Sequence, residues 1–289
     1  MSALDSHSSD PGTGKRRFGL SRPRWLNLPL AIGILFVAFW LFATVFAQFM
    51  TPFDPTELAG RRLQPPSWDH WLGTDALGRD VLTRTLYGAR HSLPIAVSVV
   101  ALAVAIGALL GALSGFLGGW FGAAVMRLVD ITLAFPPILL AMAVAASLGP
   151  GLENAAIAMV VVWWPVYARL MRAQVLEVRE REHVEAAVAG GAGRGRVLFK
   201  HILPLCWTPV LISATMDLGQ VILLAASLSF IGLGATPPTP EWGSMIADGA
   251  SQFYSWWIAL GPGLAILTVV LGFNFIGDGL HDYFDPRFD

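Results

Sequence analysis

The sequence predicts an all-α polytopic membrane protein with six transmembrane helices. Of the 289 residues, 55% are hydrophobic and 13% are charged, whereas soluble domains carry about 25% charged residues. Lys, Arg, Asp and Glu are absent from six long runs: Leu26–Met50, His91–Met126, Ile131–Leu152, Ile202–Met216, Leu218–Pro240 and Gly249–Gly277. About 20 apolar residues cross a bilayer as a helix. These runs are continuous rather than alternating, which argues against a β-barrel.

The runs place helices at 27–49, 92–117, 124–148, 153–175, 205–231 and 256–279. Lys15, Arg16 and Arg17 precede the first run as they would a signal peptide. That run is longer than the roughly 7–15 apolar residues of a signal peptide, so we expect a retained anchor. Pro136 and Pro137 interrupt the third span and should kink it.

The distribution of Lys and Arg predicts that both termini are cytoplasmic. With this orientation most basic residues lie inside, and the dissenting arginines share one outer loop: Arg61, Arg62, Arg79, Arg84 and Arg90. The resulting organisation is a cytoplasmic tail at 1–26, an outer loop at 50–91, a five-helix core at 92–280 and a cytoplasmic tail at 281–289. Within the outer loop, Arg79, Asp80, Arg84 and Arg90 alternate with apolar residues, which favours an amphipathic helix at the interface.

A polar stretch, EHVEAAVAGGAGRGRVLFKHILP at 182–204, separates two of the apolar runs. Its alanines favour a short helix, its glycines favour a turn, and a second helical piece should lead to Pro204. Small alanines permit close docking into a groove of another protein, although an ordinary basic loop is the simpler alternative. The glycines fit neither G-x-G-x-x-G nor a P-loop, so no nucleotide site is visible.

Glu185, Ala186 and Ala187, followed at fixed spacing by Gly191 and by His-Ile-Leu-Pro at 201–204, resemble the EAA loop of ABC importer permeases. In that family the loop is a coupling helix that sits in a cleft of the partner ATPase. The resemblance assigns ATPase coupling to the following residues within the loop 177–204: Glu185, Ala186, Ala187, Gly191, His201 and Pro204.

Four further segments resemble the C-type permease of the peptide and nickel importer branch: WLGTDALGRDVLTRTLYGARHSL at 71–93, RLVDITLAFPPILLA at 127–141, SLSFIGLGATPPTPEWGSMIADG at 227–249 and GDGLHDYFDPR at 277–287. The resemblance implies a type I ABC importer permease fold in the bacterial cytoplasmic membrane. It also implies a heterodimer with a related permease, two ATPase subunits and an extracytoplasmic substrate-binding protein. ATP and Mg would bind at the ATPases, and this chain would be a non-catalytic subunit without cofactor or metal. Di- or oligopeptides are the first expectation for the substrate, and nickel is the alternative.

Three features within the spans suggest specific roles: a glycine series, a charged pair and Asp217. Gly107, Gly111, Gly115 and Gly119 recur every four residues, a spacing that favours close helix packing, with a movable gate as the alternative. Arg127 and Asp130 are three residues apart and suit an ion pair at a helix end.

Asp217 lies near the middle of the fifth predicted span, where a carboxylate is costly and faces a partner or a wet cavity. It is a candidate for the substrate path, where it would meet a peptide's amino terminus. A hydrogen bond to a neighbouring helix is the structural alternative. Related permeases often carry the acid near the position of Ala225, so this chain departs from their pattern.

Two other classes of function fit the sequence less well. A self-contained secondary transporter predicts internal repeats or a relay of buried polar residues, and Asp217 is the one acid found near mid-span. An intramembrane enzyme needs a nucleophile with its base or a metal cluster within the spans. Cys206 is the single cysteine, and four histidines flank spans rather than lie inside them: His91, His183, His201 and His281.

Overall fold

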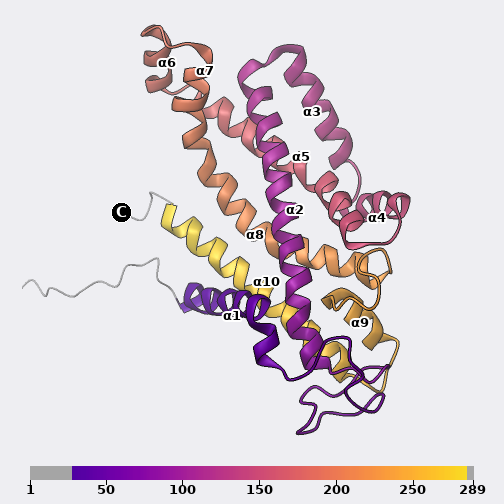
Figure 1. The fold of residues 1–289 in the computed structure, drawn as a ribbon. Coiled ribbons are helices and arrows are strands. Elements are labelled where there is room, and N and C mark those ends of the chain that lie inside the picture. The colour runs from indigo at the N-terminus through magenta and orange to yellow at the C-terminus, as the bar shows by residue number, and fades with distance from the viewer. Residues whose placement is uncertain (1–27, 285–289) are drawn as a thin grey trace, which may run out of the picture.

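The computed structural model describes residues 28–284, and these residues form a helical bundle (Figure 1). In this part of the chain the only extended pairing is one bridge between Thr74 and Asp80. The elements are α1 Leu28–Met50, α2 Val81–Leu117, α3 Gly119–Leu133, α4 Pro137–Leu148, α5 Leu152–Val178, α6 Glu182–Ala189, α7 Arg194–Arg196, the π-helix η1 Val197–Ile202, α8 Leu203–Phe230, α9 Trp242–Ala250 and α10 Trp257–Phe284.

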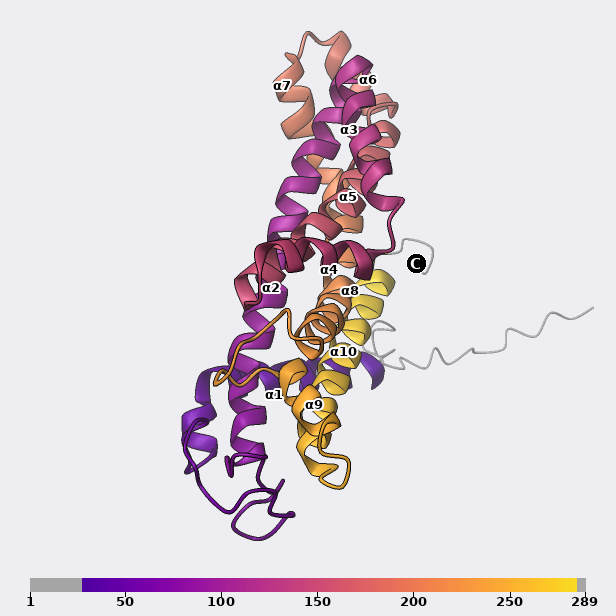
Figure 2. The same ribbon diagram turned by 90° about the vertical axis from the view of Figure 1, so that its right-hand side faces the viewer.

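Five of these helices are long and apolar enough to cross a membrane, and the pair α3–α4 makes a sixth span if the two are counted together. The predicted number of spans is therefore confirmed. The third span is broken more sharply than a kink, because α3 and α4 meet at 93°. Figure 2 shows α4 running across the bundle. Pro136 and Pro137 cause the break, since neither can donate a backbone N–H to the preceding turn.

The helix predicted within the outer loop is present but is not a separate element. Residues from Val81 onward belong to α2 itself, which runs unbroken for 37 residues. Asp80 is its N-cap and accepts a hydrogen bond from Thr83 N at 2.7 Å. Arg90 reaches from α2 to α1, where it donates to Thr44 O at 2.7 Å. Pro94, inside the helix, does not end it.

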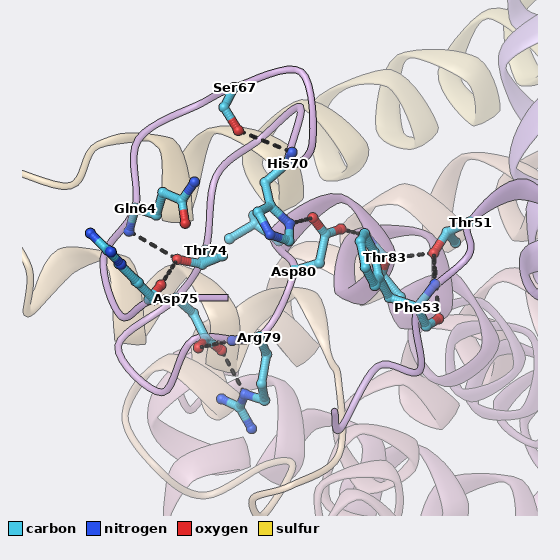
Figure 3. A network of polar contacts seen from close by, with 12 residues as sticks. Thr51, Phe53, Gln64, Ser67, His70, Thr74, Asp75, Arg79, Asp80 and Thr83 are labelled. Carbon is cyan, nitrogen blue, oxygen red and sulfur yellow. Dashed lines mark hydrogen bonds and ion pairs between the residues drawn. The ribbon is translucent and has the colours of Figure 1, made fainter. Parts of the chain in front are cut away.

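The charged residues before and inside the start of α2 are buried rather than spread on a lipid surface (Figure 3). The Arg79 guanidinium donates to Asp75 at 2.6 Å, and Arg84 lies 3.5 Å from the same carboxylate. His70 Nδ1 lies 2.9 Å from Asp80 Oδ2. Buried charges are tolerated when they are paired and hydrogen-bonded. Two of the outer-loop arginines that do not fit the basic-residue distribution, Arg79 and Arg84, thus hold this loop together.

The core of the bundle is the contact between α2 and α5. A Cβ added at Gly107 or Gly111 would overlap backbone atoms of Trp164 or Ala168 on α5, and one at Gly115 would lie 3.1 Å from Val175. Close packing, the first of the two interpretations for this glycine series, is what the structure shows. Gly119 is not part of it, because it begins α3 at φ +55° with nothing within 4 Å of an added Cβ.

Around this core, α10 packs against α1 and α8, and α9 lies between α8 and α10 in the chain. The fourth and fifth predicted spans agree closely with α5 and α8. The sixth predicted span, 256–279, corresponds to α10, which continues as a helix to Phe284. The expected tail at 1–26 and the residues after 284 lie outside the described part of the chain.

Replacing Gly111 by alanine should destabilise the protein, because the new Cβ meets the Ala168 backbone, which cannot give way. Overpacking of this kind costs about 1–3 kcal/mol. The measurement is the thermal midpoint of the detergent-solubilised protein. Gly263→Ala on α10 is the matched control, since its Cβ meets nothing within 4 Å. Equal midpoints for the two variants would show that the α2–α5 contact is not tight.

Candidate functional site

The EAA loop forms a projecting unit at one end of the bundle, at the top of Figure 1. It consists of α6, a glycine turn, the short α7 and η1, which leads directly into α8. From Arg194 to Phe230 the helical path is continuous over 37 residues. The expected sequence of helix, turn and helix is present. The turn and the candidate membrane helix α8 thus belong to one continuous stretch of chain.

The turn after α6 has the hydrogen bonds of a Schellman motif. Ala192 N donates to Ala187 O at 3.0 Å, and Gly191 N donates to Val188 O at 3.0 Å. Between these two bonds Gly191 has φ +80°, a conformation that costs a residue with a Cβ roughly 1–2 kcal/mol. This left-handed conformation explains why glycine stands at position 191, two residues after the last residue of α6.

The surface of α6 is open. Glu185 and Ala186 are exposed, Ala187 is half-buried, and Val188 is 57% exposed although it is apolar. Only Val184 of this helix is buried. Glu182 and Glu185 lie in the first turn, where negative charge interacts favourably with the helix dipole. An exposed helix of small and apolar residues with an acidic start has the surface of a docking element.

The other half of the loop is anchored. Val197, Leu198 and Ile202 of η1 are buried against the bundle. The π-helical turn precedes Pro204. Because proline has no backbone N–H, the carbonyl four residues before it cannot accept the usual α-helical hydrogen bond. Leu203 N instead donates to Leu198 O, five residues back. His201 is half-buried and Pro204 exposed, so these two residues lie on the stem and not on the projecting tip.

Asp217 lies on α8 and is bonded to α5. Tyr167 donates its hydroxyl to Asp217 Oδ2 at 2.6 Å, and Tyr167 is fully buried. The aspartate side chain therefore has a helix-to-helix hydrogen bond, as the structural alternative expects. Sequence reasoning did not find Tyr167, because only the three-dimensional packing of α5 on α8 brings the two together.

The predicted ion pair between Arg127 and Asp130 is wrong in its partner. Asp130 of α3 pairs with Arg169 of α5 at 2.6 Å. The ion pair therefore joins two helices instead of lying within one helical turn. The i, i+3 spacing allowed a local pair, but the long Arg169 side chain reaches across from the helix alongside.

A second buried cluster, missed by the sequence analysis, closes the opposite end of the bundle. Trp242 is fully buried at the start of α9 and donates Nε1–H to Thr85 O of α2 at 2.9 Å. Its ring meets Trp40 of α1 edge-on at 5.0 Å. Glu241 caps α9 by accepting from Gly243 N and Ser244 N, both at 2.9 Å. Burial raises the pKa of Glu241, and these backbone donors oppose that rise.

Comparison with known proteins agrees with this architecture. Residues 107–289 match the family described as binding-protein-dependent transport system inner membrane component. The chain belongs to this family. Because the match covers more than half of the chain and includes the EAA loop, the type I ABC permease fold and the multi-pass membrane architecture apply to this protein.

Several curated proteins resemble the chain over most of its length. The dipeptide transport system permease protein DppC of Escherichia coli is 47% identical over 90% of each chain. The protein of the same name from Alkalihalophilus pseudofirmus is 45% identical over 89% of this chain and 85% of its own. The di/tripeptide transport system permease protein DppC of Pseudomonas aeruginosa is 45% identical over 88% and 87% of the two chains.

The Tyr167–Asp217 bond allows a test of what the acid does. If Asp217 acts through this bond alone, Tyr167→Phe should lower the free energy of unfolding by about 0.5–1.5 kcal/mol. Asp217→Asn should lower it by no more, because the amide oxygen can still accept from the Tyr167 hydroxyl. Uptake per assembled complex would then be unchanged in both. A loss of uptake in Asp217→Asn that Tyr167→Phe does not share would instead place the carboxylate in the substrate path.

Proposed function

We propose that this chain is the permease subunit of an ATP-driven importer for di- or oligopeptides, forming half of the translocation path. The observation that carries the proposal is the exposed helix α6, which ends in the Gly191 turn and continues through η1 into the membrane helix α8. This is the arrangement required to receive a movement outside the bilayer and to pass it to a span.

In this proposal the chain carries out no chemistry. ATP and Mg bind to two partner ATPases, each permease presenting its EAA loop to one of them. The residues Glu185, Ala186 and Ala187 face the ATPase, Gly191 fixes the angle of the turn, and His201 and Pro204 connect it to α8. ATP binding moves the loop, and the path opens alternately to each side of the membrane.

Three kinds of partner follow: a related second permease, the two ATPases and an extracytoplasmic substrate-binding protein. The EAA loop then faces the cytoplasm of a bacterium, with both termini on the same side. The outer loop and the α9 region face the delivery protein. Since that protein selects the cargo, the permease itself needs few specific contacts with it.

Peptides are favoured over nickel by the names of the relatives. The similar proteins are named for transport of dipeptides, of di- and tripeptides and, in a 42% identical Escherichia coli protein, probably of D,D-dipeptides. The rival of an independent secondary transporter lacks comparable support, because membership of a binding-protein-dependent family implies other subunits.

Gly191→Asp should abolish ATP-driven peptide uptake while the protein stays in the membrane. The substitution places a Cβ and a charge at φ +80° and strains the Schellman turn by roughly 1–2 kcal/mol. The measurement is uptake of a labelled dipeptide by cells that depend on this gene.

Gly193→Asp is the matched control, because it adds the same charge two residues away at φ −63° with open space around it. We expect it to keep most of the uptake. Normal uptake by Gly191→Asp, or equal loss in both variants, would contradict a coupling role for the turn geometry.

Glu185→Lys should weaken association with the ATPases by at least about tenfold, equivalent to about 1.4 kcal/mol. Charge reversal at an exposed docking residue removes an attractive contact and adds a repulsive one. The readout is the amount of ATPase that copurifies with the tagged permease. Glu182→Lys, also exposed and also in the first turn of α6, controls for the helix dipole. Unchanged copurification in both variants would show that this face of α6 is not the contact.

A further inference from the structure

The segment that joins the EAA loop to α8 has two different faces. Its helical path is continuous from Arg194 to Phe230. One face belongs to the buried core and recurs every four residues: Leu198, Ile202, Cys206 and Val210. The other face is exposed at steps of three or four residues: Arg196, Lys200, Pro204, Trp207 and Leu211. Residues at these spacings lie on one side of a helix, so the exposed face is continuous.

Along this exposed face the side chains change from cationic to apolar. Arg196 and Lys200 come first, and Phe199 beside them is 70% exposed. Trp207 follows at 39% exposure and Leu211 at 53%. A helix that enters a bilayer meets the phosphate groups first, then the interfacial layer that favours indole rings, and then the hydrocarbon. The order of side chains on this face matches that sequence of layers.

The cations of this segment have no anionic partner among the described residues. Arg194, Arg196 and Lys200 take part in none of the ion pairs found there. The basic residues just before α6 differ, because Arg181 pairs with Glu177 at 2.8 Å and Arg179 donates to a backbone carbonyl at 3.2 Å. Three exposed positive charges are therefore left for an anion that the described chain does not supply.

The depth of these charges suits lipid phosphates. Lys200 precedes Trp207 by seven residues, which is about 10 Å along a helix. Indole rings lie at headgroup level, and the polar layer on each side of the hydrocarbon is about 5–8 Å thick. The flexible methylene chain of a lysine or arginine spans the difference. A second exposed tryptophan, Trp120, lies at the start of α3, at the same end of the bundle (Figure 1).

We propose that Arg194, Arg196 and Lys200, which we call the basic segment, bind the phosphate groups of anionic phospholipids. Phe199 and Trp207 then lie in the interfacial layer of the same lipids. This inference goes beyond the proposed function, since it requires only that α8 crosses the membrane. The bound lipids hold the base of the EAA loop at one depth, while α6 keeps its exposed face for docking.

An acidic protein surface, such as one on an ATPase, is the other anion that could meet the basic segment. Lipid is favoured because the cationic face continues without interruption into Trp207 and Leu211 of the membrane helix. A docking surface for a protein outside the bilayer would have no need of this continuity. Exposed Phe199 beside the charges also suits an interfacial surface, on which basic and large apolar residues occur together.

The first test measures lipid binding to the purified complete transporter by native mass spectrometry. The complex is titrated with phosphatidylglycerol, which is anionic, and separately with phosphatidylcholine, which has no net charge. The double variant Arg196→Gln/Lys200→Gln should lower the affinity for phosphatidylglycerol by about fivefold for each charge removed, with little change for phosphatidylcholine. Arg61→Gln/Arg62→Gln is the matched control, because it removes two adjacent exposed charges from the outer loop.

We expect the control to bind phosphatidylglycerol as the native chain does. Equal losses in the two double variants would overturn the proposal, because binding would then follow net charge alone. Unchanged affinity in Arg196→Gln/Lys200→Gln would overturn it as well. Thermal midpoints of both variants check that the fold is intact.

The second test identifies the occupant in native membranes. A benzophenone amino acid replaces Phe199, and the products of illumination are separated by mass. A covalent adduct with phospholipid is the expected result. An adduct with an ATPase or another protein in place of lipid would assign the basic segment to protein docking and contradict the proposal.

Discussion

The direct backbone contact between α2 and α5 is the constraint on which the rest of the structure depends. Gly107 and Gly111 bring the two helices together at backbone atoms, and Gly115 makes room for the Val175 side chain. Inside a bilayer there is no hydrophobic drive between helices, and close packing of this kind replaces it. With α2 and α5 fixed, α3 is held against both helices, α4 is held against α5, and α8 is bonded to α5 through Tyr167 and Asp217.

The protein separates its polar groups into three levels along this scaffold. At one end the EAA loop is exposed and is shaped by the Gly191 turn. At the other end Asp75, Arg79 and Arg84 are buried with one another, and Trp242 fastens α9 to α2. Between them, Asp217 of α8 accepts a hydrogen bond from Tyr167 of α5.

Much of this architecture can be predicted from sequence, because span length and the glycine period depend on local composition alone. The apolar runs located the spans, and the EAA residues lie at a helix and turn whose geometry requires Gly191. Features that depend on distant residues were not predicted. The Asp130–Arg169 and Tyr167–Asp217 contacts join residues 39 and 50 positions apart.

The outer loop was misjudged for a related reason. Arginines that alternate with apolar residues give the same sequence pattern whether the helix lies on a lipid surface or begins inside the protein. Only the carboxylate of Asp75, placed by the fold beside Arg79 and Arg84, decides between these two environments. The burial of Arg84 against the Pro55 carbonyl at 2.9 Å depends likewise on the path of a loop that periodicity does not describe.

The central claim is that this chain carries peptides into the cell. The most direct measurement compares uptake of a labelled dipeptide, a labelled tetrapeptide and labelled nickel in cells lacking the gene, with and without the native chain. The account predicts that the native chain restores uptake of at least one peptide and leaves nickel uptake unchanged. Restoration of nickel uptake alone would contradict it and assign the protein to metal import.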